Sequence, residues 1–168
     1  MAGEARQLVV LGVGNRLRGD DAIGCLVCDE LRSSGPSSDV QRPSSVPGLF
    51  VLDCGNTPEN FLQPIADRKP TRILVVDCCS YGAKPGEFSL FSREEVDRLS
   101  YGLLSTHTLP LTLTMEMLSL ETRAAIELLG IQPERIEFGE DLSEPVRRAL
   151  PAVVGFVRQW AQGPRSDA

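Results

Sequence analysis

The chain has 168 residues, of which 42% are hydrophobic, and it carries a formal net charge of −6. Its length suffices for one domain with a substantial core, and its acidic balance argues against a nucleic-acid-binding surface, which needs a basic face. No apolar run approaches the roughly 20 residues of a membrane helix, and the N-terminus lacks the long apolar segment of a secretory signal. We therefore expect a cytoplasmic protein that neither binds nucleic acid nor inserts into a membrane.

Five short apolar segments are expected to form strands, with helices between them. The predicted strands are Leu8–Leu11, Leu49–Leu52, Arg72–Val76, Phe88–Phe91 and Ala125–Leu129. The predicted helices are Asp21–Leu31, Pro58–Ala66, a segment after Pro110 that includes Met117, and Ser143–Trp160. Strands that alternate with helices predict a doubly wound α/β fold with a mostly parallel sheet of about five strands. The third segment is continuously apolar, as is typical of a central strand, and the turn before the fourth allows one antiparallel pairing.

Residues 1–168 are expected to form a single domain, apart from two segments outside its packed part. Ser33–Gly48 is rich in Ser, Pro and Gly, and a loop of this length is uncommon in a compact domain. We predict a mobile loop here and no domain boundary, because the segments on either side resemble parts of one sheet. The tail Gly163–Ala168 is predicted to be frayed.

The five cysteines are Cys25, Cys28, Cys54, Cys78 and Cys79. Four of them lie in or beside predicted core elements, so reduced and buried thiols in a cytoplasmic protein are the simplest interpretation. The C-x-x-C spacing of the first two can also indicate a redox or zinc site, but such a site needs a thioredoxin-like context or a second pair. This pair falls inside a predicted helix and no second C-x-x-C exists, which favours a structural role.

A glycine-rich segment with two adjacent carboxylates directly follows the first predicted strand. It runs from Gly12 to Gly24 and contains Asp20 and Asp21. Ligands bind at the carboxyl ends of strands in open α/β sheets, although either acid can equally be the N-cap of the following helix. A dinucleotide site is disfavoured, because Leu17 breaks the G-x-G-x-x-G pattern and the two acids would face the pyrophosphate.

Three polar residues are expected to meet at this edge of the sheet. Asp21 follows the first strand, Asp77 ends the third, and His107 lies in a loop before a helix. If the first and third strands are parallel neighbours, these residues form an O, O, N ligand set for a first-row divalent metal, with zinc, manganese, iron and nickel all compatible. Each residue taken alone also has a structural interpretation, as a helix cap, a strand end held by backbone donors, or a surface histidine. Asp53, which ends the second strand, is either a substrate contact or a cap of the following turn.

Several blocks of sequence occur in a recognisable order. They are Gly12-Val13-Gly14-Asn15 with Gly19-Asp20-Asp21, then Asp53 to Asn60, Pro70 to Asp77 with Lys84-Pro85-Gly86-Glu87, Ser105 to Leu111, and Leu129 to Pro133. Together they resemble the nickel–iron hydrogenase maturation endopeptidase family, and the later blocks resemble its hydrogenase-3 branch. The resemblance covers most of the chain and implies a three-layer α/β/α sandwich.

The resemblance also implies a function. The family removes a short C-terminal extension from the hydrogenase large-subunit precursor after nickel has been inserted, so the nickel is supplied by the substrate and no organic cofactor is expected. Its metal-binding positions fall on Asp21, Asp77 and His107, and the first two are the candidate catalytic residues. Asp53, Asn15 and Asp20 are candidates for contacting the substrate or supporting the ligands.

We expect a monomer whose partner is the hydrogenase large-subunit precursor. The competing hypotheses are a non-catalytic metal-sensing chaperone that binds the same precursor, and a nucleotide-binding α/β module.

Overall fold

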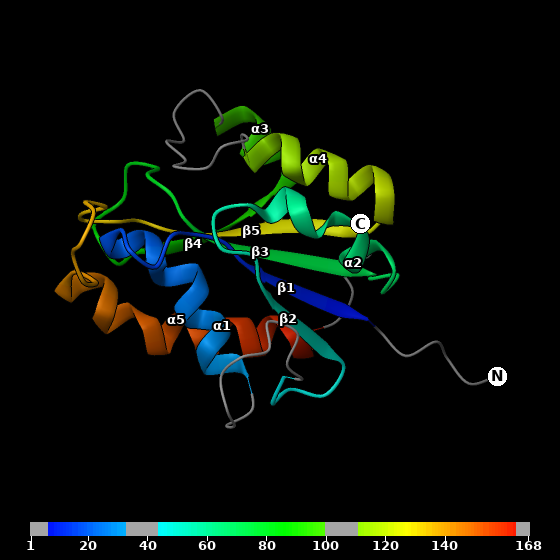
Figure 1. Ribbon diagram of the computed structural model, residues 1–168, viewed down its shortest axis with the longest axis horizontal. Helices are drawn as coiled ribbons and strands as arrows, with labels where there is room; N and C mark the ends of the chain where they lie inside the picture. The colour runs from blue at the N-terminus through cyan, green and yellow to red at the C-terminus, as the bar shows by residue number, and fades with distance from the viewer. Residues whose placement is uncertain (1–6, 33–43, 100–110, 164–168) are drawn as a thin grey trace.

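The five predicted strands are all present in the computed structural model, which describes residues 7–32, 44–99 and 111–163 (Figure 1). They are β1 (Leu8–Gly12), β2 (Leu49–Asp53), β3 (Arg72–Cys78), β4 (Phe88–Ser92) and β5 (Ala125–Ile131). The sheet has the order β2-β1-β3-β5-β4. β4 runs antiparallel to β5, and the other pairings are parallel. The predicted central strand, parallel neighbours and single antiparallel pairing are therefore confirmed.

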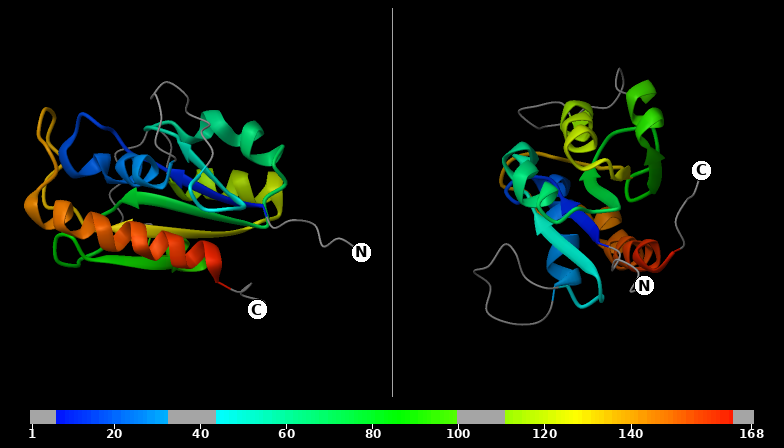
Figure 2. Two further views of the ribbon diagram at one scale, coloured as in Figure 1. Left: turned by 90° about the horizontal axis from the view of Figure 1, so that it is seen from below. Right: turned by 90° about the vertical axis from the view of Figure 1, so that its right-hand side faces the viewer.

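Helices cover both faces of this sheet and make the predicted three-layer α/β/α sandwich (Figures 1 and 2). α1 and α5 lie on one face, and α2, α3 and α4 lie on the other. The helical segments are η1 (Gly19–Ala22), α1 (Ile23–Leu31), η2 (Pro58–Phe61), α2 (Leu62–Ala66), α3 (Arg93–Leu99), α4 (Leu111–Thr122) and α5 (Glu144–Gln162).

The core is divided by the sheet because successive side chains of a strand point to opposite faces. In β1, Leu8 and Val10 pack with the cluster that includes α1 and α5. Val9 and Leu11 pack with the cluster beneath α2, α3 and α4. This two-sided burial is the reason why β1 and the middle of β3 are continuously apolar.

Two glycines of the segment after β1 allow α1 to pack closely against the carboxyl edge of the sheet. Gly24 lies in the first turn of α1, and a Cβ there would overlap the carbonyl oxygens of Val13 and Val76. Gly14 has φ +147°, and a Cβ there would overlap the carbonyl of Asp21. These contacts are with backbone atoms, which cannot move aside as a flexible side chain can. The glycines therefore set the position of η1 and of the carboxylates that it carries.

Gly24→Ala should accordingly destabilise the protein by about 1–3 kcal/mol, the usual cost of overpacking a tight contact. Gly155→Ala in α5 is the matched control, since a Cβ at that position meets no atom within 4 Å and alanine favours helix by up to about 1 kcal/mol over glycine. Urea unfolding of both variants measures the difference. Equal stabilities of the two variants would contradict the close approach at Gly24.

The helix α3 is not among the predicted elements, although the sequence carries a signal for it. Ser92-Arg93-Glu94-Glu95 matches the S-x-x-E pattern of a capping box. The Glu95 amide donates to Ser92 Oγ at 3.2 Å, and the Ser92 amide donates to Glu95 Oε2 at 2.7 Å. The short length of the helix explains why apolar periodicity alone misses it.

The prediction that Asp20 or Asp21 is the N-cap of the first helix is wrong. The helical segment begins with the 3-10 turn η1, whose N-cap is Arg18, and neither η1 nor α1 has a side-chain cap. Both carboxylates make other contacts.

The predicted mobile loop and frayed tail lie mostly outside the described residues. Of the loop, residues 44–48 are described, and Ser44 forms a bridge with Arg32; of the tail, only Gly163 is described. Within the described ranges, no helix is both long and apolar enough to cross a membrane.

Candidate functional site

Asp21 and Asp77 are buried at the carboxyl edge of the sheet, where the sequence places them. Asp21 lies in η1, which follows the loop of residues 13–18 after β1, and Asp77 is the penultimate residue of β3. Their residues are 1% and 0% exposed. Because β1 and β3 are parallel neighbours, both carboxylates belong to the same end of the sheet.

The thiol of Cys78 shows how acidic this end of the sheet is. Burial raises the pKa of Cys78, and the negative charges of Asp77, Asp21 and Asp20 raise it further. The thiol therefore stays protonated at neutral pH.

The turn before Asp21 is held by its own polar groups. The Asn15 amide donates to Asp21 Oδ2 at 3.2 Å, and the Asn15 side-chain carbonyl accepts from the Leu17 amide at 2.9 Å. Asn15 therefore supports the position of Asp21, which is one of the two roles expected for it.

Asp20 anchors a second loop to this turn. Its carboxylate accepts four hydrogen bonds, from the amides of Glu134 (2.8 Å), Arg135 (3.0 Å) and Ser143 (2.7 Å) and from Ser143 Oγ (2.8 Å). Asp20 is fully buried, and its hydrogen-bonding capacity is largely used by these donors. The side chain thus joins η1 to the loop after β5 and to the start of α5.

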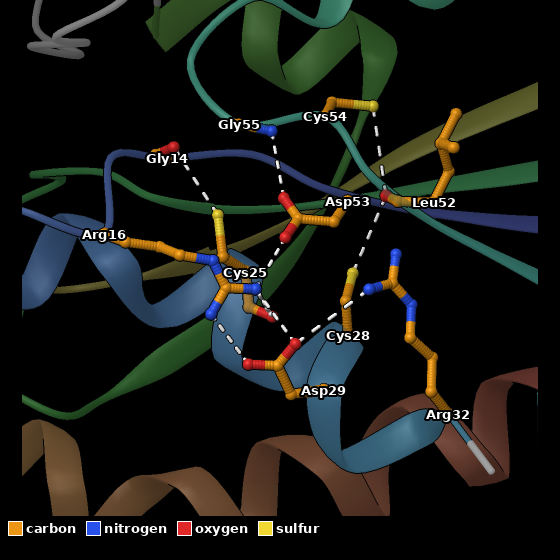
Figure 3. Close-up of polar contacts among 10 residues, drawn as sticks. All are labelled: Gly14, Arg16, Cys25, Cys28, Asp29, Arg32, Leu52, Asp53, Cys54 and Gly55. Atoms are coloured by element: carbon orange, nitrogen blue, oxygen red, sulfur yellow. Dashed lines mark hydrogen bonds and ion pairs between the residues drawn. The ribbon is translucent and has the colours of Figure 1, made fainter. Parts of the chain in front are cut away.

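Asp53, at the end of β2, belongs to an ion-pair network with Arg16 (Figure 3). Arg16 Nη2 lies 2.6 Å from Asp53 Oδ2, and Arg16 Nη1 lies 2.7 Å from Asp29 Oδ2. The other oxygen of Asp53 accepts from the Gly55 amide at 3.0 Å. Burial opposes the ionisation of Asp53, but the hydrogen bonds from Arg16 and Gly55 outweigh it and lower its pKa. The predicted cap of the turn is therefore present, and Asp53 also fixes the loop after β1.

Three cysteines pack around this network without forming a disulfide. Cys25, Cys28 and Cys54 are free and buried, and their thiols approach the carbonyl oxygens of Gly14 (Cys25) and Leu52 (the other two) at 3.5–3.9 Å (Figure 3). Burial and the charge of Asp53 raise the pKa of Cys28 to about 12. A protonated, buried thiol is poorly suited to redox chemistry. The structural interpretation of the C-x-x-C pair is therefore supported.

The third predicted ligand, His107, lies outside the described residues, in the range 100–110. Within the described residues, no group of three or more His, Cys, Asp or Glu side chains is arranged to hold a metal ion. The described part of the site consequently supplies two carboxylates, and a ligand set of three needs a group from elsewhere.

Two residues that the sequence interpretation did not single out help to build the site. Arg16 connects the turn after β1 to Asp29 and Asp53, and Ser143 donates twice to Asp20. Their partners lie 13 to 123 positions away along the chain, so no local pattern indicates these contacts. The one local hint is the position of Arg16 within the glycine-rich segment, between Gly14 and Gly19.

Comparison of the chain with known proteins identifies its family. The model for the family described as "Hydrogenase maturation protease" matches residues 38–160. A Methanocaldococcus jannaschii protein described as a candidate hydrogenase maturation protease is 35% identical over 134 residues, which are 79% of this chain and 76% of that protein. The hydrogenase 3 maturation protease of Escherichia coli K12 is 29% identical over 90% of this chain and 89% of its own length.

Solved structures of similar fold belong to the same family. The NiFe hydrogenase maturation protease HycI from Thermococcus kodakarensis KOD1 has a TM-score of 0.74 and 29% identity, with 96% of each chain covered. The solution structure of the endopeptidase HycI from Escherichia coli has a TM-score of 0.75 and 27% identity, with 92% of this chain and 91% of that chain covered. The chain is thus a peptidase and belongs to the hydrogenase maturation protease family.

Proposed function

We propose that this endopeptidase removes a C-terminal extension from the nickel-loaded large-subunit precursor of a nickel–iron hydrogenase. The nickel is part of the substrate, and Asp21, Asp77 and His107 contact it. Family membership supports the reaction. The observation that supports the place of the reaction is the burial of two carboxylates at one edge of the sheet, Asp77 at the end of β3 and Asp21 in the turn that follows the neighbouring parallel strand β1.

The chemistry of these side chains suits a metal carried by the substrate. Carboxylate oxygen and imidazole nitrogen are both ligands for first-row divalent metals. Docking of the precursor metal against Asp21 and Asp77 would hold the nearby scissile bond in one position, and such positioning lowers the barrier to hydrolysis.

Asp21 or Asp77 can also act as the general base of the reaction. A carboxylate that is not occupied by the metal can take a proton from the attacking water as a general base. The rigid turn made by Asn15, Gly14 and η1 keeps Asp21 at a fixed position relative to β3. The protein thus supplies orientation and a proton acceptor, while the precursor brings the metal.

Mass spectrometry of a defined mixture tests the reaction. Purified protein is incubated with nickel-loaded large-subunit precursor, and we expect a shortened precursor together with the released C-terminal peptide. A precursor that is bound but keeps its full mass would favour the metal-sensing chaperone. A precursor that is neither bound nor shortened would reject both functions for that precursor.

A further inference from the structure

Two loops at the carboxyl edge of the sheet are joined into one unit, which we call the double loop (residues 13–19 and 133–143). The Gly139 amide donates to the Leu17 carbonyl at 2.8 Å, and the Gly19 amide donates to the Glu140 carbonyl at 3.1 Å. The buried Asp20 carboxylate accepts hydrogen bonds from the amides at both ends of the second loop, those of Glu134 and Ser143. Figure 1 shows this loop, in orange before α5, beside the blue segment that leads into α1. The unit is therefore well ordered by hydrogen bonds although it lies at the surface.

The double loop exposes two large apolar side chains. Leu17 is 60% exposed and Phe138 is 72% exposed. They lie on different loops, but the bond between Gly139 and Leu17 brings the two backbones together. A rigid surface that presents apolar side chains loses little conformational freedom when a partner covers it, and aromatic anchors are enriched at the centres of interfaces.

Acidic residues flank Phe138 in the sequence. The segment from Glu134 to Glu144 is exposed at its charged positions and contains one basic residue, Arg135. Its acidic residues are Glu134, Glu137, Glu140, Asp141 and Glu144. The arginines of the double loop are engaged within the chain: Arg18 donates to the Ile136 carbonyl, Arg16 pairs with Asp29 and Asp53, and Arg135 lies 3.9 Å from Glu140. A partner that is complementary to Phe138 and the acidic residues beside it presents an apolar pocket flanked by basic side chains.

The double loop adjoins the candidate site directly. The Asp21 amide donates to the Arg18 carbonyl at 3.0 Å, and the Asp20 amide donates to the Arg135 carbonyl at 2.9 Å. The double loop therefore borders the turn that carries Asp21, where the substrate metal is proposed to bind. Because the double loop lies next to the candidate site, the precursor is favoured over an unrelated protein as its partner.

We propose that Leu17, Phe138 and the acidic rim of the double loop form the surface that docks the body of the hydrogenase large-subunit precursor. The inference rests on the proposed function and adds where the folded precursor binds. This surface selects a precursor that presents an apolar pocket and basic side chains to it, whereas the buried carboxylates act on the precursor's metal.

The affinity of purified nickel-loaded precursor for immobilised protein tests this surface. The double variant Leu17→Ser, Phe138→Ser should bind at least about tenfold more weakly than wild type, the effect expected for losing two interface anchors. Leu120→Ser is the matched control, because Leu120 is 76% exposed but lies near the end of α4; it should bind as wild type does. Both variants replace exposed side chains, so their thermal unfolding should match that of wild type.

The acidic rim is tested by reversing one of its charges. Glu137→Lys should also bind the precursor more weakly than wild type does. Raising the salt concentration should weaken binding by wild type more than binding by this variant. An unchanged affinity of the double variant would overturn the inference. So would a wild-type dimer that the double variant fails to form, since the surface would then belong to a second copy of the chain. Cleavage by wild type, followed in the same samples, reports separately on the proposed function.

Discussion

Asp21→Asn and Asp77→Asn should each lower the rate of precursor cleavage by about a thousandfold or more, within the range that a positioned acid or base supplies. Both residues are buried at the carboxyl edge of the sheet, and an amide is nearly the same size as a carboxylate. It carries no negative charge, however, and cannot accept a proton from water at neutral pH. The substitution therefore removes the proposed metal ligand or base with little change in shape.

His107→Ala should have an effect of the same size, because it removes the only imidazole of the chain. Asp67→Asn is the matched control, since Asp67 is exposed at the end of α2 and contacts Gln63. Cleavage rates from mass spectrometry and unfolding midpoints would be measured on the same preparations. Near-normal cleavage by any of the first three variants would remove that residue from the proposed site.

Asp20→Ala is expected to lower the free energy of unfolding by about 3 kcal/mol or more. Hydrogen bonds to a charged group contribute roughly 1.5–3 kcal/mol each, and buried donors that lose their acceptor carry a desolvation cost. The substitution takes the acceptor from the amides of Glu134, Arg135 and Ser143 and from the Ser143 hydroxyl. These losses are not additive, so the sum over four bonds is an upper limit.

Urea unfolding measures this effect, with the exposed Asp141→Ala as the control. Ser143→Ala should lose part of the same stability, because it removes one of the four bonds and leaves the amide bond in place. A loss below about 1 kcal/mol for Asp20→Ala, the value of a single ordinary hydrogen bond, would show that the double loop is held by other contacts.

The strands and the edge of the sheet that carries the site were predictable because both signals are local. Apolar runs of four or five residues mark β1, β2 and β3, and mostly apolar segments mark β4 and β5. The glycine-rich turn after β1 marks the edge where ligands bind. The place of Asp21 and Asp77 follows from two facts that the sequence supports, namely that each follows or ends a strand and that the strands are parallel. The structure confirms that pairing.

The roles of Asp20 and Asp53 were not predictable, because their partners are distant in the sequence. Asp20 has the sequence position of an N-cap, yet its carboxylate binds the loop more than 110 residues away. Asp53 matches a turn-capping residue, and it does cap the turn at Gly55, but its ion pair with Arg16 depends on the parallel packing of β1 and β2. Tertiary contacts decide between local alternatives of this kind.

Recognition of nickel in the precursor can be measured by comparing two forms of one substrate. The same large-subunit precursor, prepared with and without nickel, is incubated with wild-type protein, and the released C-terminal peptide is quantified by mass spectrometry. We expect release from the nickel-loaded form and none from the nickel-free form. Equal release from the two forms would show that the site does not recognise nickel.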